Sequence, residues 1–323
     1  MKQVIAGDIG GTNCRLVLAR VEAEQVDILY EQHYLARDAA EFETILGRFL
    51  DEFDADTGID AACFAVAGPV RGHRATLTNL PWTLDSNQLQ QRFSIGRVHL
   101  INDFVANGYS LDVLDRQDCL VLQDGLAASG TRAVVGAGTG LGMALVADTT
   151  AGIQVLASEG GHMDFAPLDD EQADLLRFLR RDTERVSYEH VVSGPGLVRL
   201  YRYYAWRNGV DPASLLQSED APAEVSRLAL MDNDPPAVSA LGLFFRIYGS
   251  CAANLALVGL ATGGVYLAGG IAARLAEALG HSGFLETFNN KPPMSELLEK
   301  IPVKVITNPR AGLLGAAWYA GNQ

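Results

Sequence analysis

Apolar residues occur along the chain in short runs and in longer segments where they recur three and four positions apart. A short run is typical of a buried strand, and the wider spacing is typical of an amphipathic helix. Strands are expected at 2–6, 14–21, 27–36, 61–67, 98–101, 132–136, 143–147, 153–157, 265–268 and 303–307. Helices are expected over 39–53, 170–181, 196–206, 221–231, 236–261, 272–279 and 311–320, with one more starting near Asp85 and Ser86. This alternation predicts the α/β class.

A strand, a glycine turn and a second strand follow one another twice, near 3–21 and near 132–147. Each unit is followed by a mixed stretch of strands and helices. The repetition favours two related α/β domains over one doubly wound sheet. With 323 residues, the chain also has the length expected of about two domains.

One segment, 238–261, is long and apolar enough to be compared with a membrane span. Arg246, Ser250 and Asn254 interrupt it and no basic flank follows, so a buried core helix is favoured and no membrane partner is expected. The apolar stretch at the N-terminus is too short for a signal peptide. The four cysteines are widely spaced and form no C-x-x-C motif, which fits a reducing cytoplasm.

Acidic residues exceed basic ones, for a formal net charge of −14. Nucleic acid and anionic membrane surfaces are therefore excluded as partners, since no run of basic residues is present to attract them. Lysine is nearly absent, because only Lys2, Lys291, Lys300 and Lys304 occur. This excludes a P-loop, which needs a lysine after its glycines, and a protein kinase, which needs a lysine on a strand. A bound nucleotide must be held by other groups.

The first glycine turn combines glycines with Asp, Thr and Asn side chains. Glycines allow a backbone to approach a phosphate, and successive N–H groups in such a turn form an anion-binding concavity. The residues expected to bind phosphate are Gly7, Asp8, Ile9, Gly10, Gly11 and Thr12. Asp8 is expected to hold Mg²⁺ directly or through water. The alternative is an ordinary β-hairpin turn, which has no use for so many polar side chains.

Two more glycine segments follow later in the chain. The segment 136–142 lies between two strands, so it fits the Rossmann fingerprint poorly, and we expect Gly138 and Thr139 to grip the same polyphosphate as the first turn. Gly269 and Gly270 stand between a strand and a helix and suit the sugar and base of a nucleotide. A simple strand-to-helix turn is an equally good interpretation of this last pair.

Polar residues that can do chemistry follow the strand at 98–101 and recur further on. A carboxylate at the end of a strand is placed as a general base, yet Asn or Asp before a helix is also a good N-cap, so we expect one of Asn102 and Asp103 to cap and the other to face ligand. Two glycines join Glu159 to His162 and permit a tight loop that aims both side chains into one pocket, where they suit sugar hydroxyls. A metal site there would be incomplete, and a surface turn is the other alternative. Glu189, taken alone, is interpreted as a surface helix residue.

Together these motifs resemble the bacterial glucokinases of the group without a zinc motif. The matching segments, in chain order, are GDIGGTNCRL, LTNLPW, INDF, GAGTGLG, EGGHMDFAP, VSGPGLV, LAGGI and NPRAGLLGAA. The related repressor–kinase family carries a cysteine-rich zinc loop after its Glu-x-Gly-His, whereas here no cysteine follows His162 until Cys251. Cys14 stands where a small residue such as Ala is expected, a neutral change.

The resemblance implies the ribonuclease-H-like fold of actin and hexokinase, in which two α/β domains flank a cleft for glucose and ATP. It implies a small domain at 1–112, completed by the C-terminal segment 304–323, and a large domain at 113–303. In the family's pattern Asp103 is the general base, and the sugar is bound by Asn102, Asp103, Glu159, His162 and Glu189. Nucleotide binding is implied for the 7–12 turn, for Gly138 and Thr139, and for Gly269 and Gly270.

The activity that the resemblance implies is phosphorylation of D-glucose at its 6-hydroxyl by ATP, with Mg²⁺ as cofactor, in the cytoplasm and in a homodimer. A kinase for fructose, mannose or an amino sugar is an alternative, because hydrogen-bonding side chains indicate a polyhydroxyl ligand rather than one epimer. A non-catalytic sugar-binding regulator is disfavoured by the intact Asp103 and by the two intact glycine turns. A chaperone-like ATPase is disfavoured by the Glu159–His162 segment.

Overall fold

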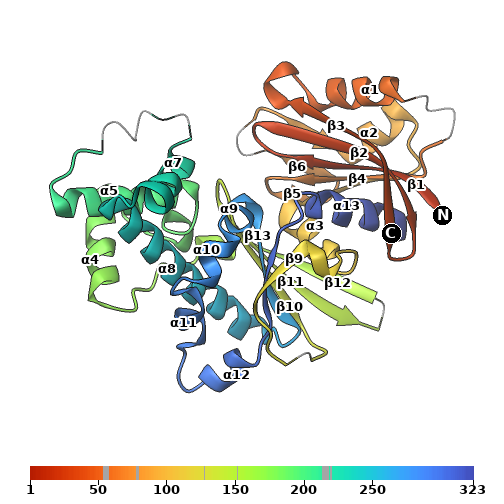
Figure 1. Ribbon diagram of the computed structural model, residues 1–323. Helices are drawn as coiled ribbons and strands as arrows, with labels where there is room; N and C mark the ends of the chain where they lie inside the picture. The colour runs from red at the N-terminus through yellow and green to blue at the C-terminus, as the bar shows by residue number, and fades with distance from the viewer. Residues whose placement is uncertain (54–57, 78–79, 127, 151, 213–217, 219) are drawn as a thin grey trace. The chain divides into compact units, whose positions relative to one another are not determined.

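The structure is a computed structural model, and it describes residues 1–323 except 54–57, 78–79, 127, 151, 213–217 and 219. Contacts divide the chain into two units (Figure 1). The first unit holds Met1–Asp118, Thr149–Ala157 and Asn308–Gln323, and the second holds Cys119–Asp148 and Ser158–Thr307. Each unit is an α/β body with a sheet of its own, as the repeated strand–turn–strand pattern predicts.

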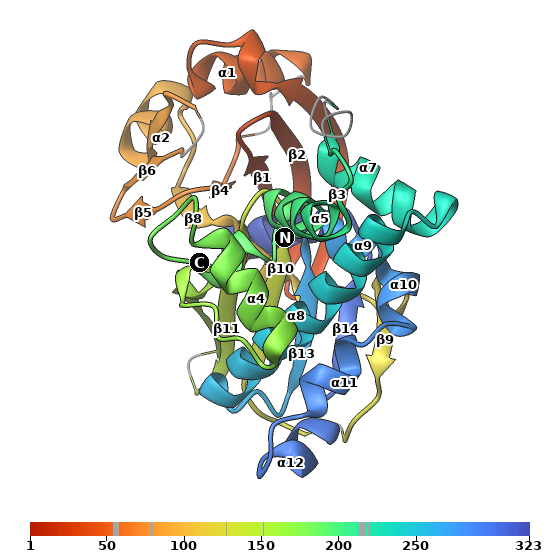
Figure 2. The ribbon, with the colours of Figure 1, turned by 90° about the vertical axis from the view of Figure 1, so that its left-hand side faces the viewer.

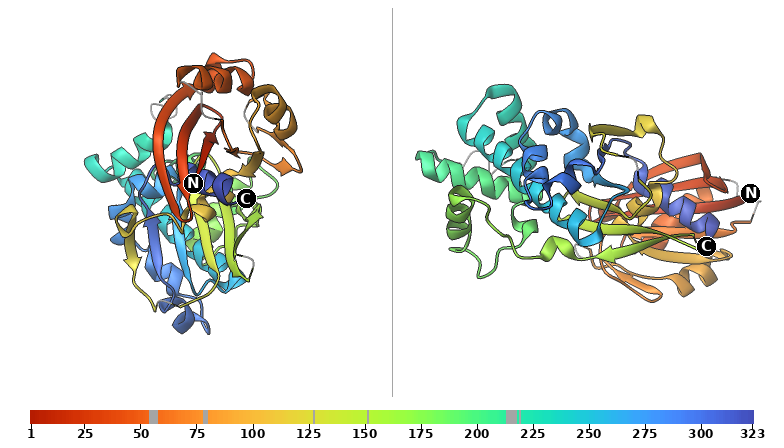
Figure 3. Two further views of the ribbon diagram at one scale, coloured as in Figure 1. Left: turned by 90° about the vertical axis from the view of Figure 1, so that its right-hand side faces the viewer. Right: turned by 90° about the horizontal axis from the view of Figure 1, so that it is seen from below.

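The first unit contains the chain's N-terminal strands and its C-terminal helix, and Figure 3 shows both termini on it. Its strands are β1 (Lys2–Ile9), β2 (Asn13–Glu22), β3 (Gln25–Leu35), β4 (Ala61–Val66), β5 (Val70–Arg71), β6 (Arg74–Thr76), β7 (Thr83–Asp85), β8 (Val98–Asn102) and most of β12 (Gly152–Ser158). Its helices are α1 (Phe42–Glu52), α2 (Ser86–Phe93), α3 (Asp103–Ser110) and α13 (Ala311–Asn322), with 3-10 turns at Ala36–Asp38 and Arg116–Asp118.

The main sheet of the first unit has the strand order β3-β2-β1-β4-β8. β1 and β2 form an antiparallel hairpin, while β1, β4 and β8 run parallel. Because side chains alternate along a strand, β1 buries Ile5 and Ile9 in a core with α1, and Val4 and Ala6 in a core with α13. Because β1, β4 and β8 run parallel, their carboxyl ends meet at one edge of the sheet. Helices cover both faces of this sheet.

The C-terminal helix α13 belongs to this unit by direct packing. Leu313, Ala316 and Ala317 are buried against Val4 and its neighbours on β1. Gly315 faces α3 so closely that a Cβ atom there would overlap the carbonyl oxygen of Ala106. Small residues on α13 thus allow the two helices to lie against the same face of the sheet.

The second unit is larger and richer in helix. Its strands are β9 (Cys119–Gln123), β10 (Arg132–Ala137), β11 (Leu141–Thr149), β13 (Gly264–Ala268) and β14 (Val303–Ile306). Its helices are α4 (Asp170–Leu179), α5 (Gly194–Asn208), α7 (Ala221–Arg227), α8 (Pro235–Gly259), α9 (Gly269–Arg274), α10 (Ala276–Gly280), α11 (Phe284–Asn289) and α12 (Ser295–Glu299). Single turns lie at Gly160–His162 (η3), Tyr188–His190 (η4) and Leu228–Asp232 (η5).

Within this unit the strand order is β11-β10-β13-β14-β9. β10 and β11 form an antiparallel hairpin and β10, β13 and β14 run parallel, so the hairpin and two parallel strands of the first unit occur again. Helix α8 packs against β10 and β13 (Figure 2). The Tyr248 hydroxyl donates to the Val135 carbonyl at 3.1 Å, so a hydrogen bond connects the helix to β10.

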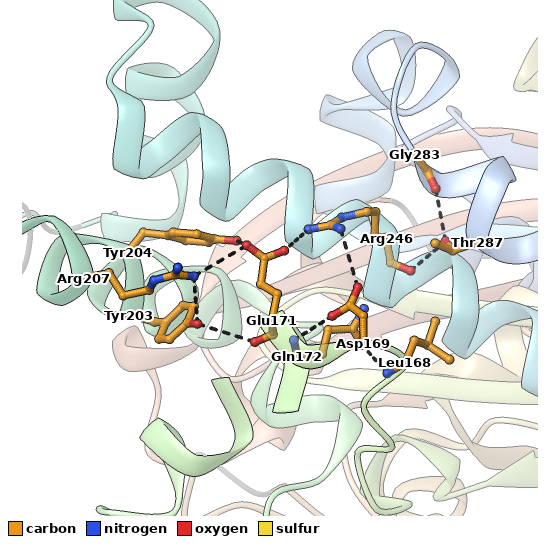
Figure 4. A network of polar contacts seen from close by, with 10 residues as sticks. All are labelled: Leu168, Asp169, Glu171, Gln172, Tyr203, Tyr204, Arg207, Arg246, Gly283 and Thr287. Atoms are coloured by element: carbon orange, nitrogen blue, oxygen red, sulfur yellow. Dashed lines mark hydrogen bonds and ion pairs between the residues drawn. The ribbon is translucent and has the colours of Figure 1, made fainter. Parts of the chain in front are cut away.

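Helix α8 is the long apolar segment of the sequence, and 72% of its most apolar stretch is buried inside the protein. Its charge, Arg246, points to Glu171 of α4, with 2.5 Å between Nη2 and Oε2 (Figure 4). The Tyr204 hydroxyl of α5 donates to the other oxygen of Glu171 at 2.6 Å. Burial alone would raise the pKa of Glu171, but these two hydrogen bonds lower it overall. The prediction of a core helix is confirmed. The hydrogen bonds of Arg246 on α8 and Tyr204 on α5 to Glu171 on α4 connect the three helices.

Several element boundaries differ from those expected. β1 runs on to Ile9 instead of ending at residue 6, because Gly7 and Ile9 are buried and paired with β2 and β4. The helix expected over 272–279 is two short helices that start at Gly269 and break at Leu275. The helix expected over 221–231 ends at Arg227 and continues as a π turn.

The division by contacts also differs from the expected domains. Residues 304–306 were assigned to the first domain, but they lie in β14, which pairs with β13 in the second unit's sheet. Residues 113–118 and 149–157 were expected in the large domain, but the contacts group them with the first unit.

Candidate functional site

The first glycine turn connects β1 to β2 and is shorter than the sequence suggested. Only Gly10, Gly11 and Thr12 lie outside the strands, and the Gly10 N–H donates to the Asn13 carbonyl at 2.9 Å. Thr12 is exposed, so its hydroxyl and the turn's backbone are open to a ligand.

Gly7, Asp8 and Ile9 precede this turn and were all expected to bind phosphate, but they lie in a strand inside the first unit. Gly7 and Ile9 lie within β1 and are buried. A Cβ atom on Gly7 would lie 2.8 Å from both Leu16 and Phe64, so this glycine is required by core packing. Among these three residues, Asp8 has the polar side chain that can bind a ligand.

A second acidic residue of the first unit stands at the end of β8. Asn102 is the N-cap of α3, and its Oδ1 accepts a hydrogen bond from the Phe104 N–H at 2.9 Å. Asp103 is the first residue of the helix, and its Oδ1 accepts from the same N–H at 3.1 Å. Asn102 is therefore the residue that caps the helix, as was expected of one of the two. Asp103 lies in the first turn, where the helix dipole favours a negative charge.

Both carboxylates of this edge have raised pKa values. Burial, with a further contribution from the charge of Asp8, raises the pKa of Asp103 to about 6. Burial also raises the pKa of Asp8, against the opposing effect of Arg15, which faces it across the β1–β2 pair. A carboxylate with a pKa near 6 is ionised at neutral pH and still basic enough to accept a proton during a reaction.

Asp8 fits the way in which Mg²⁺ is usually held beside a nucleotide. Among the residues that the structure describes, no group of three His, Cys, Asp or Glu side chains could hold a metal. Mg²⁺ commonly takes one or two carboxylates and completes its shell with phosphate oxygens and water. The single carboxylate of Asp8, next to the first glycine turn, is compatible with that arrangement.

The second glycine turn, between β10 and β11, consists of Gly138, Thr139 and Gly140. The Gly138 N–H donates to the Gly140 carbonyl at 2.8 Å, and Thr139 is exposed. The N-terminus of α5 lies beside it, since the Gly194 N–H donates to the Gly138 carbonyl at 2.8 Å. The turn and the end of a fifteen-residue helix are thus adjacent, an arrangement that suits an anion.

Sequence reasoning noticed the Ser-Gly-Pro-Gly segment but assigned it no role. Ser193 is the N-cap of α5 and accepts from the Gly196 N–H at 3.0 Å, with Pro195 in the first turn. The helix was expected to begin at residue 196, two residues after its observed start, and Ser before Pro is a usual signal of such a start. Its position beside Gly138 could not be predicted from the sequence.

The structure brings together the three side chains of the second unit that were expected to bind sugar. His162 lies between two carboxylates, with Nε2 4.0 Å from Glu159 and Nδ1 3.9 Å from Glu189. Glu159 is the most exposed of the three, at 78% of its side chain, and Glu189 is the least, at 33%. Glu189 is not the free surface residue that it looked like in isolation, because its Oε2 accepts from the Leu141 N–H at 2.9 Å.

The glycine pair at the start of α9 is exposed, and one of its members is needed by the backbone. Gly269 has φ of +86°, and a Cβ atom there would also lie 2.7 Å from the Ala137 carbonyl. Gly270 has an open environment. Both interpretations of the pair, a strand-to-helix turn and a contact for a nucleotide's sugar, are compatible with this geometry.

Comparisons with known proteins agree over the whole chain. The family model described as Glucokinase matches residues 5–323. A glucokinase of Nostoc punctiforme is 40% identical over 99% of both chains. The chain belongs to the glucokinase family. The crystal structure of a glucokinase from an Antarctic psychrotroph covers 100% of both chains with a TM-score of 0.88 and 34% identity. That of the Balamuthia mandrillaris glucokinase in complex with glucose covers 99% of this chain and 94% of its own, with a TM-score of 0.78 and 27% identity.

Family membership confirms two expectations that rested on resemblance. The fold is the ribonuclease-H-like α/β fold of the hexokinase-like ATPases, and the hairpin followed by parallel strands, present once in each unit, is its repeating element. The recognition of a bacterial glucokinase from eight short motifs was correct.

Proposed function

We propose that this chain transfers the γ-phosphoryl group of ATP to the 6-hydroxyl of D-glucose, with Asp103 as the general base. Its membership of the glucokinase family supports the reaction and the sugar. The observation that carries the residue assignment is the carboxylate of Asp103 at the end of β8, whose pKa is raised to about 6 by burial and by Asp8. Such a group is ionised and ready to accept a proton at neutral pH.

In the proposed reaction Asp103 accepts the proton of the 6-hydroxyl while that oxygen attacks the γ-phosphorus. The new O–P bond forms as the bond between the γ-phosphorus and the β–γ bridging oxygen breaks, and ADP leaves with that oxygen. Asn102, which caps α3 beside Asp103, and Glu159, His162 and Glu189 hold sugar hydroxyls. Their oxygens and ring nitrogens supply the acceptors and donors that a polyhydroxyl ligand needs.

The phosphates are bound chiefly by backbone N–H groups, since the chain between residues 3 and 290 has no lysine. The N–H groups of Gly10 and Gly138 close their own turns, so we assign this role to Gly11 and Thr12 of the first turn and to Thr139 of the second. Gly269 and Gly270 contact the adenosine. When bound beside Asp8, Mg²⁺ neutralises charge on the phosphate oxygens.

Gly7 and Ile9 take a different place in the proposal from the one first expected. Both are buried in β1, so we assign them to the core packing that positions the turn and Asp8, and not to contact with phosphate. Cys14, Cys63 and Cys251 are buried free thiols, which supports a cytoplasmic enzyme. The homodimer stays a prediction of the family resemblance.

The test is ADP release measured against glucose, fructose, mannose and glucosamine, with the Asp103→Ala protein as control. We expect glucose to give the highest kcat/KM and the control to be nearly silent. Another sugar with a higher kcat/KM would contradict the assigned substrate. Sugar-independent ADP release, or none at all, would contradict kinase activity.

A further inference from the structure

We propose that Glu189 is a positioning residue for the nucleotide turn, so that one side chain links the sugar site of the second unit to its phosphate site. The inference rests on the proposed function, which assigns sugar to Glu189 and phosphate to Thr139 of the second glycine turn. It adds a physical connection between the two ligands that neither assignment contains.

The two carboxylate oxygens of Glu189 face different partners. Oε2 accepts the N–H of Leu141, the first residue after the glycine turn, at 2.9 Å. Oε1 lies 3.9 Å from Nδ1 of His162, on the sugar side. A hydrogen bond to an ionised acceptor is stronger than one between neutral groups, so the turn's exit is held by a charged side chain.

The turn itself is shaped to accept this carboxylate. A Cβ atom on Gly140 would lie 2.5 Å from Oε2 of Glu189, so glycine at 140 leaves the space that the carboxylate fills. Gly138, two residues earlier, has no atom within 4 Å of the same position. The two glycines therefore differ: one makes room for Glu189 and the other borders open space.

The sugar loop contacts the same strand end from a second direction. A Cβ atom on Gly161 would overlap the carbonyl oxygen of Leu141, so the loop between Glu159 and His162 lies directly on the residue whose N–H Glu189 holds. The main chain of Glu189 is also held in place, because the Ser193 hydroxyl donates to its main-chain carbonyl at 2.7 Å.

A sugar hydroxyl that binds Oε1 thus acts on a group that already positions the turn. Coupling between two ligands is reciprocal, so any factor by which sugar changes the affinity for nucleotide is also the factor by which nucleotide changes the affinity for sugar. This predicts effects in both directions, and each direction has a matched control in the same unit.

The first experiment measures binding of the non-hydrolysable analogue AMPPNP with Mg²⁺, without sugar, by calorimetry. Glu189→Ala removes the acceptor for the Leu141 N–H, and we expect AMPPNP to bind about five- to twentyfold more weakly. Glu189→Gln keeps an acceptor oxygen and should recover part of the loss. Glu184→Ala, which removes an exposed carboxylate of the same unit that has no assigned role in the site, should leave AMPPNP affinity within twofold.

The second experiment measures glucose binding without nucleotide. Gly140→Ala places a methyl group against the Glu189 carboxylate, and we expect glucose to bind about five- to twentyfold more weakly. Gly242→Ala, which adds the same methyl group at an exposed position of α8 with no atom within 4 Å, should bind glucose as the unaltered protein does.

The inference is overturned if Glu189→Ala weakens glucose binding but leaves AMPPNP affinity unchanged, or if Gly140→Ala and Gly242→Ala bind glucose alike. Failure of the proposed function looks different. An unaltered protein that binds no AMPPNP, or no glucose, removes the kinase assignment and the coupling together.

Discussion

The two units share a hairpin followed by two parallel strands, yet they place different chemistry on it. In the first unit the edge beside the glycine turn carries carboxylates, Asp8 on β1 and Asp103 after β8. In the second unit the strand equivalent to β8 is β14, and uncharged Thr307 and Asn308 follow it. There the polar groups, Glu159, His162 and Glu189, come from a loop residue and two 3-10 turns.

The repeated topology therefore provides a hairpin turn for phosphate in both units, whereas the acidic and imidazole side chains differ between them. A hairpin turn with small residues exposes N–H groups wherever it occurs. The acid at the end of β8 has a raised pKa because it is buried next to another acid, and nothing in the shared topology requires that. The proposed base therefore belongs to the first unit alone.

The largest expected effect is that of Asp103→Asn, which keeps the shape of the side chain and removes the base. We expect kcat to fall by roughly 10²–10⁴-fold while glucose binding, measured by calorimetry, survives. Asp51→Asn, which removes an exposed carboxylate from α1 of the same unit, is the control and should retain normal kcat. A kcat for Asp103→Asn near that of the control would remove the main contrast between the units.

The two glycine motifs can be distinguished by stability. Gly7→Ala forces a methyl group against Leu16 and Phe64 in a buried core, and we expect a loss of about 1–3 kcal/mol in the free energy of unfolding. Gly138→Ala meets open space and should change it by less than about 0.5 kcal/mol. Denaturant unfolding of both variants measures the difference. Equal losses would show that the first motif is no more constrained by packing than the second.

The smallest predicted effect concerns the exposed end of the sugar cluster. Glu159→Gln removes one charged hydrogen-bond acceptor, and we expect the KM for glucose to rise about tenfold, with the KM for ATP unchanged. Glu184→Gln, another exposed acid of the second unit, is the control. Equal rises in both KM values for Glu159→Gln would indicate damage to the unit instead of loss of a sugar contact.

Local patterns predicted much of the fold. Asp85 as the N-cap of α2, and the apolar periods of α1 and α8, depend on neighbours in sequence, and all three occur as expected. The strand–turn–strand repeats were recognisable for the same reason. The error at β1 arose because glycine was taken to end a strand, whereas Gly7 is there to let β2 and β4 pack closely.

Contacts distant in sequence were beyond local patterns. Glu189 and Leu141 are 48 residues apart, and Glu171 and Arg246 are 75 apart. No spacing or composition connects them, because their proximity follows from how α4, α5 and α8 pack on the second sheet. The family's motifs predict Glu189 as a sugar ligand, whereas its hydrogen bond to Leu141 at the second glycine turn required the structure.

The most direct test of Asp103 as the base is the pH profile of kcat/KM for glucose. Burial and the charge of Asp8 raise its pKa to about 6, and only the ionised carboxylate accepts a proton. The rate constant should therefore be level just above that pH and fall about tenfold per pH unit below it. In Asp103→Asn this acidic limb should vanish from the residual activity. An acidic limb at the same pH in both proteins would contradict the account.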